Sequence, residues 1–136
     1  MSDDLVTPDN LSKELLKSLF DSAFLETSWD DEGDLRVKDR IRCFALPSEN
    51  KDRIRLLAIF GFKDGATPAQ RLECVNNINR EYIMVRAAIG SNGVLRFDHD
   101  IYVKGGVTKK NVVLATKRFL SIPLEAIEDH GKELVV

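Results

Sequence analysis

His99 stands between two aspartates, in the sequence Asp98-His99-Asp100, and it is the first candidate for chemistry in this chain. A histidine has an ordinary pKa of about 6.5, so it can act as a general base or respond to pH near neutrality. No serine or cysteine stands at a spacing that singles it out as a nucleophile, although the fold could bring Cys43 near. Because His99 alternates in phase with apolar residues, we favour a structural histidine that forms a hydrogen bond near a strand end.

The segment Lys104–Lys110, with the sequence KGGVTKK, is a candidate anion contact. Glycines that open a helix N-terminus leave backbone N–H groups free, and these groups attract negative charge together with the helix dipole. Two lysines in the first turn interact unfavourably with that dipole, and a bound anion would compensate for their charge. The Gly-Lys-Ser/Thr of a P-loop is absent, so we favour a strand-to-helix joint with solvated lysines. The candidate contacts are Lys104, Gly105, Gly106, Thr108, Lys109 and Lys110.

Four acidic residues surround Gly33 in the segment Asp30–Asp34, which invites a calcium-binding interpretation. The segment lacks the alternating oxygen ligands, the glycine position and the closing glutamate of an EF-hand loop. A hairpin turn explains the same composition, because these residues favour turns. We therefore predict no metal site and no cofactor.

The two cysteines, Cys43 and Cys74, match no metal-ligand or redox spacing. Cys43 falls on the apolar phase of a predicted strand, whereas Cys74 lies opposite the apolar stripe of a predicted helix, where we expect it to be exposed. The N-terminus is acidic and lacks the basic-then-apolar order of a signal peptide, and no apolar run approaches the length of a membrane span. We therefore predict a reduced cytoplasmic protein with no disulfide and no membrane partner.

Basic residues alternate along one predicted strand and continue onto the next, and they could contact the phosphates of a nucleic acid. A nucleic-acid-binding sheet would interleave aromatic side chains for base stacking, and here only Phe44 shares the phase. The net charge of −2 gives no bulk attraction to a polyanion. We favour a solvated strand face and keep nucleic-acid binding as an alternative. The residues of this basic stripe are Arg36, Lys38, Arg40, Arg42, Arg53 and Arg55.

Hydrophobic periodicity predicts three main helices. The helix at 7–23 carries apolar residues at three- and four-residue spacing, and Thr7-Pro8 supplies its N-cap and first helical position. Thr67 begins the second helix with a capping box. Thr108 caps the third helix, which Ile122-Pro123 interrupts before a short helical segment from Leu124 to His130.

Alternating apolar residues predict five strands, and an Asn-Gly turn at 90–93 joins the last two as a hairpin. The middle strand is apolar on both sides at LLAIF, so its second face needs a cover. The predicted strands are 24–30, 34–46, 52–62, 81–89 and 94–104.

A chain of 136 residues with 43% apolar and 31% charged residues is typical of one folded domain. We predict a single domain over 1–136, with loose ends at 1–8 and 131–136. Short turns join neighbouring strands, which makes them antiparallel. The element order α-β-β-β-α-β-β-α predicts an α+β fold, a two-layer sandwich of an antiparallel five-stranded sheet with helices on one face.

The order of elements resembles that of the YbjN family of bacterial sensory-transduction regulators. The resemblance covers about Leu11 to Ile127 and is carried by Asn76 and Asn79, by the turn and strand SNGVL that begins at Ser91, and by the Gly105-Gly106 break. It implies a fold similar to that of type III secretion chaperones, and a small regulator, adaptor or chaperone-like protein without enzymatic activity. It transfers no catalytic residue.

An apolar set on the sheet face without helices is the preferred functional feature. Such a patch with an arginine rim is what a partner or dimer surface needs. The set is Leu57, Ile59, Met84, Ala88 and Tyr102, with Arg55, Arg86 and Arg96 at its rim. Alternatively, Leu134 to Val136 or a tilted helix covers these residues.

We therefore predict a non-enzymatic protein-binding regulator or chaperone-like adaptor that holds a protein partner or forms a homodimer. The alternatives are a small anionic-ligand binder or enzyme that uses Lys104–Lys110, and a nucleic-acid binder that uses the basic stripe.

Overall fold

The computed structural model describes residues 4–136, and its main feature is a six-stranded antiparallel sheet. Its strands follow the order β2 (Glu26–Trp29), β3 (Leu35–Asp39), β4 (Ile41–Pro47), β5 (Arg53–Phe60), β7 (Leu95–Tyr102) and β6 (Arg86–Ile89). The helices are α1 (Lys13–Ser22), α2 (Pro68–Glu81) and α3 (Lys109–His130). A separate two-stranded sheet joins β1 (Leu5–Val6) to β8 (Val107–Thr108).

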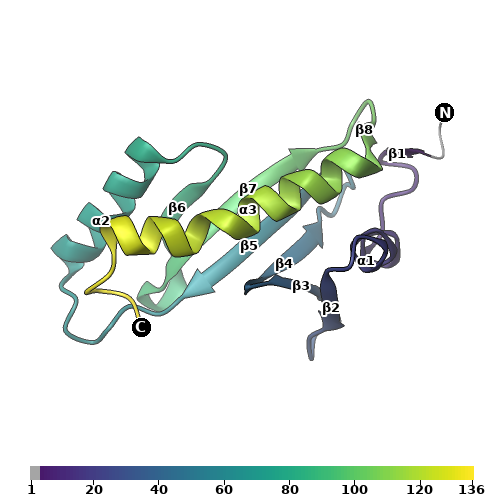
Figure 1. The fold of residues 1–136 in the computed structure, drawn as a ribbon. Helices are drawn as coiled ribbons and strands as arrows, with labels where there is room; N and C mark the ends of the chain where they lie inside the picture. Colours follow the sequence, from purple (N-terminus) through teal and green to yellow (C-terminus); the bar gives the residue numbers. More distant parts are fainter. Residues whose placement is uncertain (1–3) are drawn as a thin grey trace.

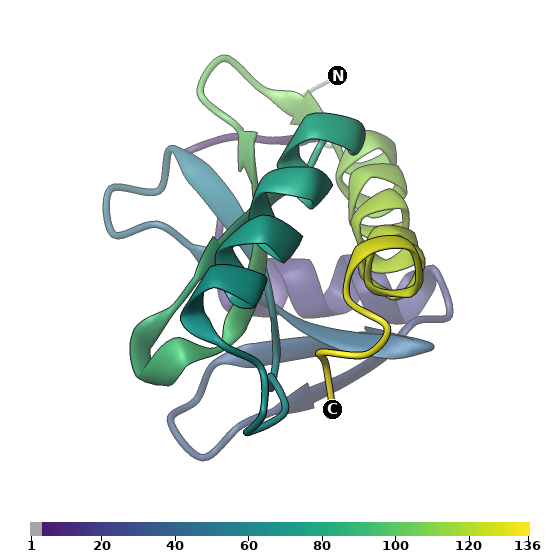
Figure 2. The same cartoon turned by 90° about the vertical axis from the view of Figure 1, so that its left-hand side faces the viewer.

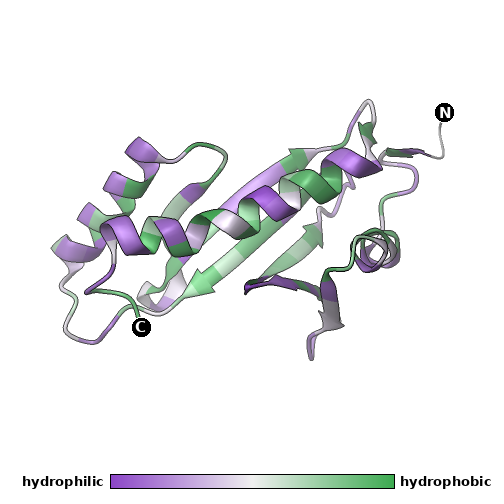
Figure 3. Ribbon diagram, in the orientation of Figure 1, coloured by the Kyte–Doolittle hydropathy of each residue, from purple (hydrophilic) through white to green (hydrophobic). Residues whose placement is uncertain are grey.

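The three helices pack on one face of the large sheet, which confirms the two-layer α+β class (Figure 1). The helix α3 contacts the central strands, α1 contacts β2 to β4, and α2 contacts β6 and lies beside α3 at one end (Figure 2). Hydrophobic and hydrophilic residues alternate along α3, as Figure 3 shows, because only one of its sides meets the sheet. The core therefore lies between this helical layer and the inner face of the sheet.

The predicted strand at 34–46 is two strands, so the sheet has six strands rather than five. The chain reverses at Arg40, which has a φ of +70°. Val37 then pairs with Cys43, and Leu35 pairs with Ala45. The two residues of each pair are an even number of positions apart in the sequence, so their side chains point to the same face of the sheet. The reversal therefore keeps every buried residue of this segment on the inner face.

The helix α1 begins five residues later than predicted, at Lys13 instead of Pro8, because Ser12 rather than Thr7 is its N-cap. The Ser12 side chain accepts a hydrogen bond from the Leu15 N–H at 3.0 Å. The Thr7 carbonyl instead closes a turn by accepting the Leu11 N–H at 3.0 Å. Of the predicted loose end at 1–8, residues 1–3 lie outside the described residues, whereas Leu5–Val6 form β1.

The helix α3 continues through Pro123, where the sequence predicts an interruption. A proline inside a helix removes one backbone hydrogen bond and costs about 3 kcal/mol. Here Ile122, Pro123 and Ala126 are all buried. Burial of this apolar side holds the helix together through the proline.

The C-terminal segment 131–136 is paired, although the sequence predicts a loose end. Val135 forms an antiparallel bridge with Phe62 and is buried. The Val136 N–H donates to the Gly61 carbonyl at 2.9 Å. The tail therefore adds to the core beyond the end of β5.

The helix α2 begins as predicted, with the reciprocal capping box of Thr67 and Gln70. Its buried side differs from the prediction at Cys74, which is buried rather than exposed, whereas the apolar Leu72 is 54% exposed. The reason is a long-range contact. Gly131 lies so close to the Cys74 Sγ atom that a Cβ at residue 131 would be 3.2 Å from it.

Asn79 on α2 ties the helix to the edge strand β6. Its Nδ2 donates to the Ala87 carbonyl at 2.9 Å, and its Oδ1 accepts the Ala87 N–H at 2.8 Å. The side chain therefore satisfies both backbone groups of Ala87, as a neighbouring strand would.

We expect Asn79→Ala to lower the free energy of unfolding by about 1–2 kcal/mol, because two hydrogen bonds are lost at once. Urea denaturation measures the change. Asn76→Ala is the matched control, since Asn76 is exposed on the same helix, and its effect should stay within about 0.5 kcal/mol. Equal effects of the two substitutions would contradict this role of Asn79.

Phe24 follows α1 in the left-handed backbone region, with a φ of +64°, and its side chain is 96% exposed. Glycine is the usual residue at this place after a helix, because a side chain there costs roughly 1–2 kcal/mol. We expect Phe24→Gly to raise the free energy of unfolding by about 0.5–1 kcal/mol after the entropy cost of glycine is subtracted. Thermal denaturation of Phe24→Gly tests this. The control is Phe24→Ala, which removes the ring but keeps a Cβ atom in the left-handed region. A melting temperature of Phe24→Gly below that of the wild type would show that the ring contributes a stabilising contact.

Candidate functional site

The candidate site is the outer face of the large sheet, which we define as the face opposite α1, α2 and α3. Alternate residues of each strand point to this face, and the strand register brings them into rows. One row crosses all six strands and consists of Ser28, Arg36, Phe44, Leu57, Asp98 and Arg86.

An apolar strip crosses the centre of the outer face. It consists of Phe44 and Leu57, which are register partners and half-buried, and of Ile59, which is 51% exposed. Ala88 is in the same row as Ile59, on the far side of Arg96. The C-terminal tail does not cover the strip, since its Val135 packs in the core instead.

Two residues of the predicted apolar set lie apart from this strip. Tyr102 is 58% exposed but opposes Arg53, about 20 Å along β7 from Arg96 at the usual strand rise. Met84 is 45% exposed and belongs to the loop before β6, with a φ of +61°. The central strip is therefore smaller than the predicted set, and it includes Phe44, which the sequence assigns only to the basic stripe.

Asp98 lies under two arginines in the middle of the outer face. Its carboxylate is almost fully buried, and it accepts two hydrogen bonds from Arg86, at 3.0 and 3.1 Å, and one from Arg96 at 3.1 Å. Sequence reasoning missed this carboxylate. The predicted turn at 90–93 would place residue 86 opposite residue 97, whereas the observed register is shifted by one residue and pairs Arg86 with Asp98.

Asp100 forms a second carboxylate site at the rim. Arg55 donates to both of its oxygens, at 2.9 and 3.0 Å, and Arg53 lies at 3.8 Å. The hydrogen bonds from Arg55 hold the pKa of Asp100 below its ordinary value. The predicted rim arginines Arg55 and Arg86 are thus already paired within the chain.

The basic stripe is different, because within residues 4–136 its β3–β4 part has no carboxylate within ion-pair distance. Arg36 donates to the Ser28 hydroxyl and to the Trp29 carbonyl, both at 3.1 Å. Lys38 and Arg42 are exposed and directly opposed across β3 and β4. Arg40 stands apart at the turn.

The Lys104–Lys110 segment has a structural role in the fold. Gly105 and Gly106 adopt φ angles of +90° and +93°, and a Cβ on Gly106 would meet the Leu5 side chain at 3.1 Å. Thr108 caps α3 as predicted, by accepting the Asn111 N–H at 3.0 Å. The exposed residues of this segment are Lys104, Gly105, Thr108 and Lys110, and Lys109 is half-buried.

His99 points to the inner face, where it is half-buried opposite Leu56. Cys43 and Cys74 are both free and buried. Burial raises the pKa of the Cys43 thiol to about 12 and also raises the pKa of Cys74. Both thiols therefore stay protonated at neutral pH, in which form they are poor nucleophiles.

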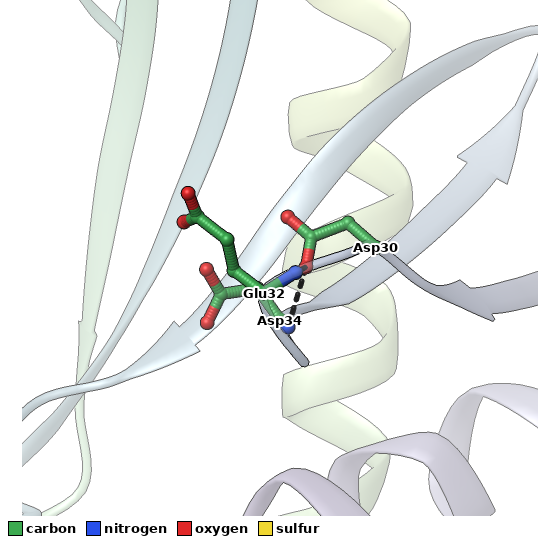
Figure 4. Close-up of side chains that lie close together, drawn as sticks. All are labelled: Asp30, Glu32 and Asp34. Carbon is green, nitrogen blue, oxygen red and sulfur yellow. Dashed lines mark hydrogen bonds between the residues drawn. The ribbon is translucent and has the colours of Figure 1, made fainter.

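In the acidic turn the side chains of Asp30, Glu32 and Asp34 lie close together, within 4.8 Å of one another (Figure 4). The Asp30 carboxylate accepts the Glu32 N–H at 2.9 Å and the Asp34 N–H at 2.7 Å. These bonds explain the turn without an ion, which agrees with the hairpin interpretation.

The fold and the outer face define a small α+β protein with one helix-covered sheet face and one open face of mixed apolar and basic character. The chain belongs to the YbjN family, described as "Putative bacterial sensory transduction regulator", whose model matches residues 12–130. No curated protein matches the sequence.

Solved structures show the same fold. The crystal structure of YbjN from E. coli is similar with a TM-score of 0.75 and 15% identity, over 93% of this chain and 96% of that chain. The HopA1–SchA chaperone–effector complex contains a chain with a TM-score of 0.57 and 14% identity, over 88% and 92% of the two chains. The Yersinia pestis type III secretion chaperone SycH, in complex with a fragment of YscM2, is similar with a TM-score of 0.55 and 11% identity, over 85% of this chain and 97% of that chain. The predicted likeness to type III secretion chaperones is confirmed for the fold.

Among the described residues, no helix combines the length and the apolar character needed to cross a membrane.

The Arg55–Asp100 pair predicts a dependence of stability on pH. A depressed carboxyl pKa stabilises the folded state above the pKa of an unfolded aspartate, about 3.9, and this contribution is lost as the pH falls through the folded pKa. We expect Asp100→Asn to lower the free energy of unfolding at neutral pH by less than about 1 kcal/mol, because the pair is partly exposed. The variant should also lose less stability than the wild type as the pH is lowered. Urea denaturation at a series of pH values measures both effects. Asp64→Asn, at an exposed loop position, is the control and should leave the profile unchanged; an equally steep decline for Asp100→Asn would contradict the pairing.

Proposed function

We propose that this chain is a non-enzymatic, protein-binding regulator or chaperone-like adaptor that holds its partner on the outer face of the sheet. The observation that carries the proposal is the apolar strip of Phe44, Leu57 and Ile59 on a face that none of the helices within residues 4–136 covers. Apolar side chains gathered on a polar-rimmed surface favour association, because burying them removes their area from water.

Membership of the YbjN family supports a regulatory role, since that family is described in these terms. One of the similar structures is a chaperone–effector complex, and another is a type III secretion chaperone in complex with a protein fragment. A shared fold does not carry function by itself, whereas the composition of the outer face supports binding of a protein. The two free cysteines agree with a reducing cytoplasmic location.

The burial of both thiols and the inward position of His99 favour a binding role over catalysis. A nucleophile must reach its substrate, and a base must lie within hydrogen-bond distance of the proton that it takes. The paired arginines at the rim would orient the partner, because charged rim groups fix the register of a complex more than its affinity.

Affinity capture from native extract tests the proposal with the variant Leu57→Thr/Ile59→Thr. Threonine keeps the strand propensity and adds no charge beside Asp98. We expect the wild-type chain to retain a specific protein and the variant to retain about tenfold less of it, since the few central residues that carry most of the energy of an interface cost more than about 1 kcal/mol each when truncated.

Leu114→Gln is the matched control, because Leu114 is 53% exposed on α3, away from the outer face. This control should capture as much as the wild type does. Circular dichroism and urea denaturation must show that each variant is folded. Equal capture by the wild type and the Leu57→Thr/Ile59→Thr variant would refute a role of the outer face.

A further inference from the structure

The outer face has the opposite net charge to the rest of the chain. Its strand residues include seven basic and three acidic side chains, for a net charge of +4. The whole sequence has a net charge of −2, so the remainder carries −6. The basic residues are Arg36, Lys38, Arg42, Arg53, Arg55, Arg86 and Arg96, and the acidic residues are Glu26, Asp98 and Asp100.

The positive charge of this face is unbalanced on one side only. On β5, β6 and β7 the arginines surround Asp98 and Asp100. On β3 and β4, Lys38 and Arg42 oppose one another, and like charges in directly opposed strand positions destabilise a sheet. Glu26 faces Lys38 from β2 but lies beyond ion-pair distance. An incoming carboxylate would relieve this repulsion.

The unbalanced charges adjoin the apolar strip. Arg36 is the register partner of Phe44, and Phe44 is the register partner of Leu57. Arg42 is two residues from Phe44 on the same strand and projects to the same face. A segment lying across this region would therefore contact apolar and basic groups within one or two strand spacings, about 5–10 Å.

This arrangement disfavours a second copy as the occupant. A two-fold dimer would place the same patch against itself, so that a surface of charge +4 would meet another of charge +4. Like charges across an interface suppress association.

The arrangement also disfavours nucleic acid. Within the outer face only Phe44 and Tyr102 could stack on bases, and they lie in different rows. The remaining charge of −6 on the chain would repel a long polyanion, whereas a short acidic segment fits within the face.

We propose, building on the proposed function, that the occupant of the outer face is an acidic segment of another protein. Its carboxylates contact Lys38 and Arg42, and its apolar side chains cover Phe44, Leu57 and Ile59.

Selection from a phage-displayed library of random peptides tests this inference. The full chain is compared with Leu57→Thr/Ile59→Thr and with the charge reversal Lys38→Glu/Arg42→Glu. We expect the wild type to enrich peptides that combine Asp or Glu with large apolar residues. A synthetic copy of an enriched peptide should bind the charge-reversed variant about tenfold more weakly by fluorescence anisotropy, and added salt should weaken its binding to the wild type.

The control variants keep the test decisive. Lys38→Gln/Arg42→Gln replaces the charge reversal if that variant fails to fold. Lys104→Glu/Lys110→Glu changes two exposed lysines outside the outer face and should leave peptide binding unchanged.

The outcomes separate this inference from the function on which it rests. Enriched peptides without excess acidic residues, still lost in Leu57→Thr/Ile59→Thr, would overturn the inference and retain the binding face. Selection that does not distinguish wild type from that variant would overturn both. Displacement of the peptide by labelled random-sequence DNA, or a dimer in sedimentation that Leu57→Thr/Ile59→Thr abolishes, would replace the acidic segment with nucleic acid or a second copy.

Discussion

The antiparallel pairing of β5 with β7 is the constraint on which the structure depends. Eight residue pairs, from Arg53–Tyr102 to Phe60–Leu95, fix which side chains of both strands point inward. The inward residues meet α3 and form the centre of the core. The outward residues, which no helix of the described chain covers, carry the arginines, the aspartates and the apolar strip. A slip of one residue would exchange these two sets, so the core and the candidate site have a common origin in this register.

The sequence predicts the side of each strand residue better than it predicts the number of strands. Alternation places Leu35, Val37 and Cys43 on one face whether residues 34–46 form one strand or two, because the turn at Arg40 preserves the phase. The turn itself was missed because arginine is not a typical residue for a φ of +70°. Local chemistry was sufficient for the caps at Thr67 and Thr108.

The features that sequence reasoning could not provide depend on contacts between distant residues. Cys74 is buried because Gly131 and the tail pack on it, and a helix pattern contains no information about the C-terminus. Pro123 remains helical because tertiary burial outweighs a local cost. At the candidate site, the outward direction of Leu57 and Ile59 could be read from alternation, but the burial of Asp98 under Arg86 and Arg96 requires the register of two strands and three side-chain conformations.

The Asn79 side chain has a consequence for the behaviour of the molecule in concentrated solution. A sheet that ends in an uncovered strand can recruit strands from other molecules and grow into fibrils. At the β6 edge, an amide already occupies both backbone groups of Ala87. At the opposite edge, β2 has only four residues, and its Trp29 carbonyl accepts from Arg36. Because both edges are obstructed, the chain can expose apolar side chains to water on its outer face and still resist edge-to-edge pairing with the sheets of other molecules.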